Sequence, residues 1–196
     1  MLWLVAIGAS AFAPSSQGPL DIAIRTADGG HQLLDLAAAE LRRYAILTTS
    51  DIAQWPHAEP ALRIELVVAP ARSAWCNESE WAGELAQQQH YIRHCDSPGT
   101  FELAGGDAAG ALYAAYTFIE EVLGVGFSIH GDRLPTSRRS IAAVLAAYPA
   151  GTAGDLASPR FTKRGLFPFH DNREGPDFWS NDDYAAFIGN MLAPLA

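Results

Sequence analysis

The chain has 196 residues, which suits one domain or one domain and part of a second, and is too short for a (β/α)₈ barrel of about 250 residues with a further domain attached. Hydrophobic residues make up 49% of the sequence, enough for a sizeable core, so wholesale disorder is excluded. The net charge of −9 argues against nucleic acid or an anionic membrane surface as the main partner, and two cysteines are too few for a disulfide scaffold or a four-cysteine zinc site.

The first residues resemble an export signal. Met1 to Ala13 is apolar, ends in small residues, and is shorter than the run of about 20 apolar residues that spans a bilayer. We therefore expect residues 1–18 to be a leader and the protein to be secreted or periplasmic. No Lys or Arg precedes the apolar run. A first core strand in a cytoplasmic protein, or a start site assigned too late, is the alternative.

Strands and helices alternate in the next part of the chain. Residues 21–26 place Ile22 and Ile24 on one face, as in a short strand. A helix is predicted over residues 33–47, where apolar residues recur at helical spacing. Aliphatic residues 62–69 lie between two prolines and predict a buried strand, and the polar stretch 71–89 is predicted to be an excursion on the surface.

A hairpin and a second helix are predicted after this excursion. The turn at residues 96–99, Asp-Ser-Pro-Gly, separates strands over residues 91–95 and 100–104. Asp107 is placed to cap a helix that ends at Gly124. The apolar stripe of this helix consists of Leu112, Tyr116, Ile119 and Leu123. With a further short strand over residues 125–129, we expect residues 19–135 to form an α+β domain with a single mixed sheet and helices packed on it.

Residues 136–158 differ in composition from the domain before them. They are rich in alanine and contain Pro149, Gly151 and Gly154, as is typical of a linker. Residues 141–147 within this stretch fit either a short strand or a turn of helix.

Two local motifs invite a chemical interpretation. Residues 105–110 lie between a strand and a helix, where phosphates bind, but their pattern G-G-x-x-x-G is not a nucleotide-binding spacing. We favour a tight turn in which Gly110 allows close packing. His90 and His94 fall on a predicted strand, where positions four apart lie about 13 Å from each other, so solvated or hydrogen-bonded histidines are expected rather than a metal pair. No metal or cofactor is expected.

The two cysteines, Cys76 and Cys95, allow two interpretations. In an exported protein they could form a disulfide bond, because such bonds persist in oxidising compartments. Two buried free thiols explain the sequence equally well.

The last 40 residues predict a strand, a polar loop and an amphipathic helix. The strand covers residues 161–169, and the loop begins with His170 and Asp171. In barrel enzymes such loops, at the carboxyl ends of strands, carry the site. The loop is rich in polar and aromatic residues, which suits sugar binding, because rings stack on pyranose faces and polar groups hold hydroxyls. A solvated, salt-bridged loop is the alternative.

Two blocks resemble glycoside hydrolases. Residues 110–127, GALYAAYTFIEEVLGVGF, followed by Leu134 and Pro135, resemble a block in the non-catalytic N-terminal domain of alpha-glucuronidases and beta-hexosaminidases. Residues 158–166, SPRFTKRGL, resemble the junction at which the barrel of beta-hexosaminidase-like enzymes begins. The resemblance covers residues 20–190 in order and layout. It implies a hexosaminidase-like α+β domain, a linker, and a truncated (β/α)₈ barrel that starts at residues 159–196.

This resemblance also implies an activity and its residues. The chain would be the N-terminal fragment of an exported glycoside hydrolase that acts on poly- or oligosaccharides. Arg164 matches an arginine of the first barrel strand that holds sugar hydroxyls, and His170 and Asp171 would face the substrate. The catalytic carboxylates would lie on later barrel strands, so the chain alone is expected to be inactive. The alternative is a stand-alone carbohydrate-binding or interaction module.

Overall fold

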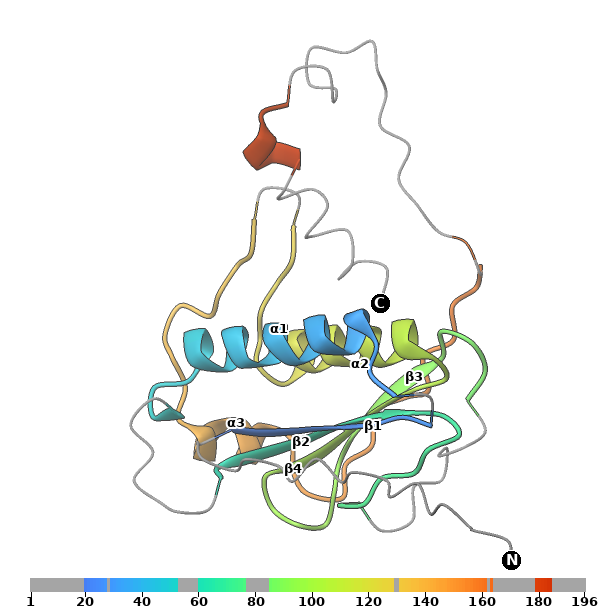
Figure 1. Ribbon diagram of the computed structural model, residues 1–196. Helices are drawn as coiled ribbons and strands as arrows, with labels where there is room; N and C mark the ends of the chain where they lie inside the picture. Colours follow the sequence, from blue (N-terminus) through green and yellow to red (C-terminus); the bar gives the residue numbers. More distant parts are fainter. Residues whose placement is uncertain are drawn as a thin grey trace, which may run out of the picture.

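The computed structural model describes residues 20–27, 29–52, 60–76, 85–128, 131–161, 163 and 179–184. Two long helices lie side by side over one face of a sheet (Figure 1). In chain order the elements are β1 (Leu20–Arg25), α1 (Gln32–Thr48), β2 (Leu62–Val68), β3 (His90–His94), β4 (Thr100–Gly105), α2 (Ala108–Glu121) and α3 (Ile141–Ala147).

Within the described residues the strands form one four-stranded sheet in the order β1-β2-β4-β3. β1 pairs with β2 and β2 with β4 in parallel, whereas β3 is antiparallel to β4 and forms the predicted hairpin with it. The expected α+β class with a single mixed sheet is therefore confirmed. The strand predicted over residues 125–129 is not among the strands. Its described part makes one bridge, between Gly126 and Arg133.

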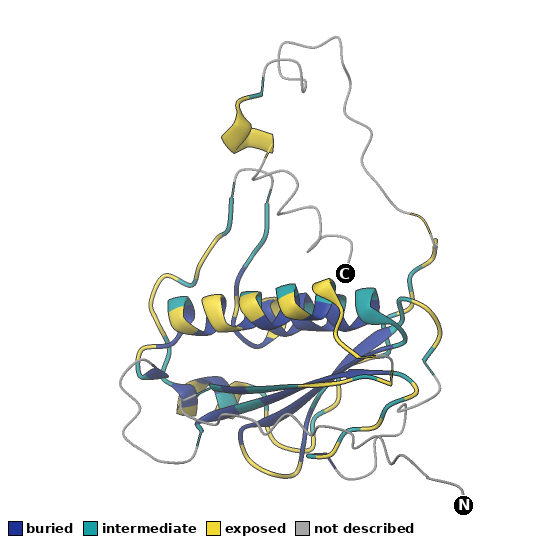
Figure 2. Ribbon diagram, viewed as in Figure 1, coloured by how far each residue is buried: buried dark blue, intermediate teal, exposed yellow. Residues whose placement is uncertain are grey.

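The core lies between the two long helices and the sheet, as the buried residues in Figure 2 show. The predicted stripe of α2 faces the sheet, and its members Leu112, Tyr116, Ile119 and Leu123 are at most 3% exposed. β2 and β4 place alternate aliphatic and aromatic residues on the same face, among them Ile64, Phe101 and Leu103. Apolar periodicity therefore positions both helices, because their stripes bury surface only against this face.

The second face of the sheet carries charged residues that are nevertheless buried. Glu65 on β2 and Glu102 on β4 are paired in register, and neither exposes any surface. The carboxylate of Glu65 accepts hydrogen bonds from the amide nitrogens of Ala74 and Trp75, at 3.0 and 3.2 Å, and from the Ser73 hydroxyl. Arg25 Nε donates to its other oxygen at 2.7 Å. Residues 73–75, predicted as part of a surface excursion, are thus tied to a buried carboxylate.

Cys76 and Cys95 are joined by a disulfide bond, and their Cα atoms lie 5.3 Å apart. Both side chains are buried. The bond connects the loop that follows β2 to the end of β3, so it holds that loop to the sheet together with Glu65. Of the two interpretations left open by the sequence, the structure contains the bonded one.

Reduction of this disulfide is expected to lower the free energy of unfolding by about 3 kcal/mol, because the bond restricts the unfolded chain across a separation of 19 residues. Urea denaturation with and without dithiothreitol measures the difference. The Cys76→Ala/Cys95→Ala double variant is the control: it should match the reduced wild-type protein and not respond to the reductant. A wild-type protein that is equally stable in both conditions would contradict the prediction.

Residues 136–158, expected to be a linker, pack on the domain. Ile141 and Val144 of α3 are buried in the core. Residues 151–157, which we call the edge segment, run along β3 and form bridges from Ala157 to His90 and from Ala153 to Arg93. Gly154 donates to the carbonyl of Ile92 at 2.8 Å, and Ala157 to that of His90 at 2.9 Å. The edge segment therefore covers backbone groups that an open sheet edge leaves unpaired.

Candidate functional site

The residues that the sequence singled out for sugar binding, Arg164, His170 and Asp171, lie outside the described residues. The leader predicted over residues 1–18 lies outside them as well. The site described below is therefore built from other side chains of the α+β domain.

The glycine-rich turn before α2 is a packing feature, as predicted. Asp107 is the N-cap of α2, and its carboxylate accepts a hydrogen bond from the Gly110 amide at 2.7 Å. The Gly106 amide donates to the carbonyl of Gln89 at 2.9 Å. A Cβ atom on Gly106 would lie 1.8 Å from the carbonyl oxygen of Ala86. The backbone of residues 86–89 thus occupies the space beside this turn, and the glycines permit that contact.

His90 and His94 are buried on β3 and hydrogen-bonded, so of the two expected alternatives, solvated or hydrogen-bonded, the structure contains the second. Nε2 of His94 accepts from the Gly99 amide at 3.0 Å, its Nδ1 lies 2.5 Å from the carbonyl oxygen of Tyr148, and its ring stacks on Phe101. His94 therefore connects the hairpin turn to the residue that follows α3. Among the described residues no group of three or more His, Cys, Asp or Glu could hold a metal ion.

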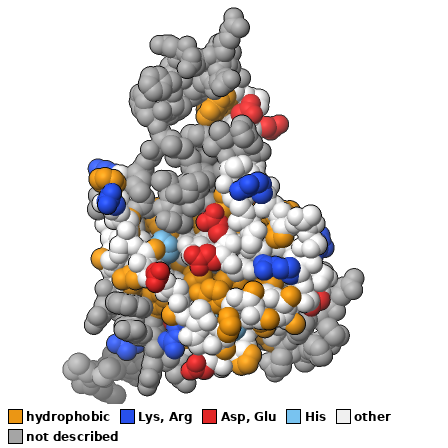
Figure 3. All heavy atoms as spheres, turned by 180° about the vertical axis from the view of Figure 1, so that it is seen from behind, with side chains coloured by type: hydrophobic (Ala, Val, Ile, Leu, Met, Phe, Trp, Pro, Cys, Tyr) orange, Lys and Arg blue, Asp and Glu red, His pale blue; other side chains and the backbone are white. Residues whose placement is uncertain are grey.

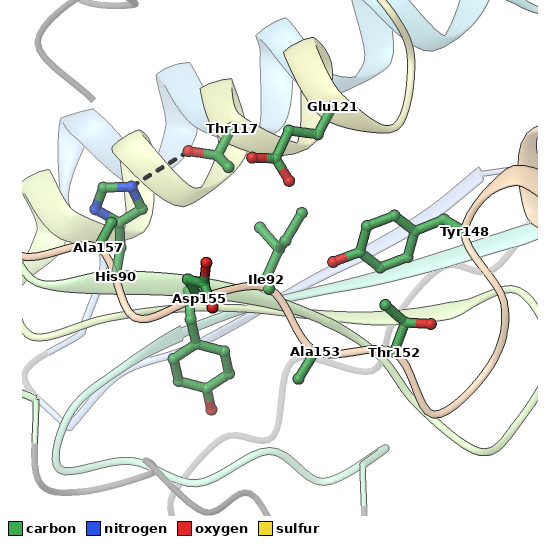
Figure 4. Close-up of a pocket in the computed structure, with 11 residues that line it drawn as sticks. His90, Ile92, Thr117, Glu121, Tyr148, Thr152, Ala153, Asp155 and Ala157 are labelled. Carbon is green, nitrogen blue, oxygen red and sulfur yellow. Dashed lines mark hydrogen bonds between the residues drawn. The ribbon is translucent and has the colours of Figure 1, made fainter.

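A cleft of about 400 Å³ lies between α2 and the edge segment, with β3 at its base (Figure 4). The lining of the cleft comes from three parts of the chain: His90 and Ile92 from β3, Thr117 and Glu121 from α2, and Tyr148 with the edge segment. Figure 3 shows that Asp and Glu side chains gather near the middle of one face of the molecule. The packing of residues 148–157 against the domain therefore creates the cleft.

His90 forms one end of the cleft and is held in place. Its Nε2 lies 3.2 Å from the Thr117 hydroxyl, and its Nδ1 lies 3.3 Å from the carbonyl oxygen of Gln88. Because a carbonyl only accepts, Nδ1 is the donor of that pair. The ring is 3% exposed and also contacts Tyr113 edge-on. His90 thus orients the Thr117 hydroxyl at the cleft wall.

The other polar side chains of the cleft are two carboxylates and a phenol. Glu121 reaches from α2 toward the space above β3. The Tyr148 hydroxyl points into that space from the end opposite His90 (Figure 4). Asp155 is on the edge segment, and both carboxylate residues are exposed. Burial raises the pKa of the Tyr148 phenol, and the negative charge of Glu121 raises it further. Tyr148 is therefore a neutral hydroxyl at physiological pH.

The donors and acceptors of the cleft define what it can bind. No lysine or arginine is among the described residues that line it, whereas Glu121 and Asp155 supply acceptors. An anion such as a phosphate would be repelled, because no positive charge offsets the two carboxylates. Thr117, Thr152 and Tyr148 are among the lining residues, and Ile92 supplies an apolar base. This combination suits an uncharged ligand rich in hydroxyl groups.

Sequence reasoning missed this cleft. Glu121 lies at the polar end of a predicted helix, and Tyr148 and Asp155 lie in the predicted linker, so nothing in their spacing places them together. The signal that could have indicated the cleft is the free edge of the predicted strand over residues 91–95, because a later extended segment can pair with such an edge.

Comparisons of this chain with protein-family models, with curated proteins and with solved structures find no match. Among the described residues, no helix combines the length and the apolar character needed to cross a membrane.

Proposed function

We propose that this chain is the N-terminal portion of an exported glycoside hydrolase of the alpha-glucuronidase or beta-hexosaminidase kind. In this proposal residues 20–135 form a non-catalytic α+β domain, residues 136–158 connect it to the catalytic part, and residues 159–196 begin a (β/α)₈ barrel. The substrate is a poly- or oligosaccharide that binds through the barrel.

The observation that carries the proposal is the order of the parts. The block at residues 110–127 forms most of α2 and the turn after it, where Gly124 has a φ of +75° and its amide donates to the carbonyl of Glu120. The edge segment then leads directly into the second block at residues 158–166. The first block is therefore part of a domain with its own core, and a packed connection separates it from the second block.

Export is supported by a separate feature, the disulfide between Cys76 and Cys95. Disulfide bonds of this structural kind persist in secreted and periplasmic proteins and are rare in the cytosol.

A substitution at Arg164 tests whether this residue holds the saccharide, as the proposal assigns. In the complete gene product, Arg164→Ala should lower kcat/KM for the saccharide by about 10- to 100-fold, because a guanidinium holds two neighbouring hydroxyls and loss of a charge-assisted hydrogen bond has an effect of that size. Steady-state kinetics on aryl β-N-acetylglucosaminides and on glucuronic-acid-capped xylo-oligosaccharides measure it.

Arg160→Ala is the matched control, because Arg160 is an exposed arginine four positions earlier. Its kcat/KM should equal that of the wild-type protein. Equal losses of kcat/KM in the two variants would show that Arg164 acts only through the surface charge. An unchanged kcat/KM in both would show that Arg164 does not bind the substrate.

A further inference from the structure

We propose that the cleft between α2 and the edge segment binds an uncharged pyranose unit of a saccharide chain. The described residues of this site come from the α+β domain and from residues 148–157, which pack on it, and do not include the residues to which the resemblance assigns the substrate. It does not depend on the proposed hydrolase activity, because binding to the cleft is measured without any turnover.

The first argument is the size and lining of the cleft. A volume of about 400 Å³ falls within the range of about 300–1,000 Å³ found for small-ligand pockets. Its base is apolar, formed by Ile92, and hydroxyls and carboxylates stand around it. A pyranose presents the same pattern, with C–H groups on the ring faces and hydroxyls on the rim.

The second argument is the set of charges. Each carboxylate, of Glu121 on one wall and of Asp155 on the other, accepts hydrogen bonds from neighbouring sugar hydroxyls, and such charge-assisted bonds are the stronger ones. The lack of lysine and arginine among the described lining residues disfavours a uronic acid or a phosphate. A metal ion is disfavoured because the described residues hold no cluster of three ligands.

The third argument is the hydroxyl of Tyr148. This oxygen is buried and has no hydrogen-bond partner, a state that is uncommon in folded proteins because it is unfavourable. A Cβ atom on Gly154 would lie 3.4 Å from it and 3.2 Å from Ile92 Cγ1, so the backbone of the edge segment packs closely against the side of the phenol and any partner must come from the cleft. A sugar hydroxyl that enters next to Glu121 would supply the missing partner.

The test is a titration of the ¹⁵N-labelled chain with xylohexaose and with N-acetylated chitotriose, followed by NMR. Saturable shifts should centre on the amides of Thr117, Glu121, Ala153 and Asp155, with a dissociation constant of about 1 mM, as expected for one sugar unit in an open cleft. Glucuronic acid should bind more weakly than the neutral sugars. Absence of saturable shifts in these residues would overturn the proposal.

Variants separate the cleft from the surface around it. Glu121→Gln should weaken binding about tenfold, because it removes one charged acceptor. Glu120→Gln, an exposed neighbour that does not line the cleft, should have no effect. Asp155→Asn repeats the test from the opposite wall. Equal binding by the Glu121→Gln and Glu120→Gln variants would overturn the proposal.

Two further measurements test the role of the Tyr148 hydroxyl and the alternative that the cleft binds a cation: the Tyr148→Phe variant and a titration with a simple diamine. The phenylalanine variant should bind sugar about fivefold more weakly while its melting temperature stays the same or rises, because the hydroxyl has no partner in the free protein. Putrescine should not compete with the sugar. Tight, salt-sensitive binding of putrescine in the cleft would show a cation site instead and would overturn the saccharide assignment.

Discussion

Gly106→Ala should lower the free energy of unfolding by about 4 kcal/mol or more, because the added methyl group has no room in the structure. The added Cβ atom would lie 1.8 Å from the carbonyl oxygen of Ala86 and 2.6 Å from its carbonyl carbon. Both are backbone atoms, so no side-chain rotation relieves the contact. The strand-to-helix turn and residues 85–89 would have to separate, and with them the hydrogen bond from Gly106 to Gln89.

Gly30→Ala is the control for this prediction. A Cβ atom on Gly30 meets nothing within 4 Å, and its φ is not in the left-handed region. This substitution should therefore be neutral or stabilise the fold slightly by restricting the unfolded chain. Urea denaturation of the two variants makes the comparison. Similar stabilities of the Gly106→Ala and Gly30→Ala variants would mean that the turn does not pack against residues 85–89.

Glu65→Ala is expected to lower the free energy of unfolding by about 4 kcal/mol, because it leaves several buried donors without an acceptor and opens a cavity on the second face of the sheet. The amides of Ala74 and Trp75 and the Ser73 hydroxyl all depend on one carboxylate oxygen. Glu65→Gln keeps the packing but removes the charge, so it should lower the free energy of unfolding by about half as much as Glu65→Ala.

Glu40→Ala is the matched control on α1. Glu40 forms an ion pair with Arg43 at 3.4 Å, and their side chains are 18% and 54% exposed, so the loss should be about 1 kcal/mol or less. Thermal and urea denaturation measure all three variants. If Glu65→Ala and Glu40→Ala lowered the free energy of unfolding by the same small amount, the loop at residues 73–75 would not be held by the buried carboxylate.

Periodicity predicted the helices and the hairpin because each of these elements buries one face. Leu112, Tyr116 and Ile119 recur at helical spacing, and the structure packs them on the sheet. The turn at residues 96–99 brings β3 and β4 together in the predicted antiparallel pair. Local sequence is sufficient in these cases because the periodic apolar residues and the turn residues are adjacent in the chain.

The elements that sequence reasoning missed depend on contacts between distant residues. Glutamate is a residue type that is usually exposed. Glu65 is buried because residues 73–75 return to the sheet and donate hydrogen bonds to its carboxylate. The edge segment contains small residues with little strand propensity, and its extended conformation follows from the open edge of β3. The cleft required both α2 and the edge segment, so no local pattern could predict it.

The central claim, that this chain is the front part of a larger glycoside hydrolase, is tested most directly on the native gene product. Antibodies raised against the recombinant chain would be used to isolate that product from the culture medium or periplasm, where its mass and its hydrolysis of the two substrates named above would be measured. The account predicts a product much larger than 21.0 kDa that hydrolyses one of them, while the recombinant 196-residue chain does not. A native product of 21.0 kDa or less without hydrolase activity would contradict the account.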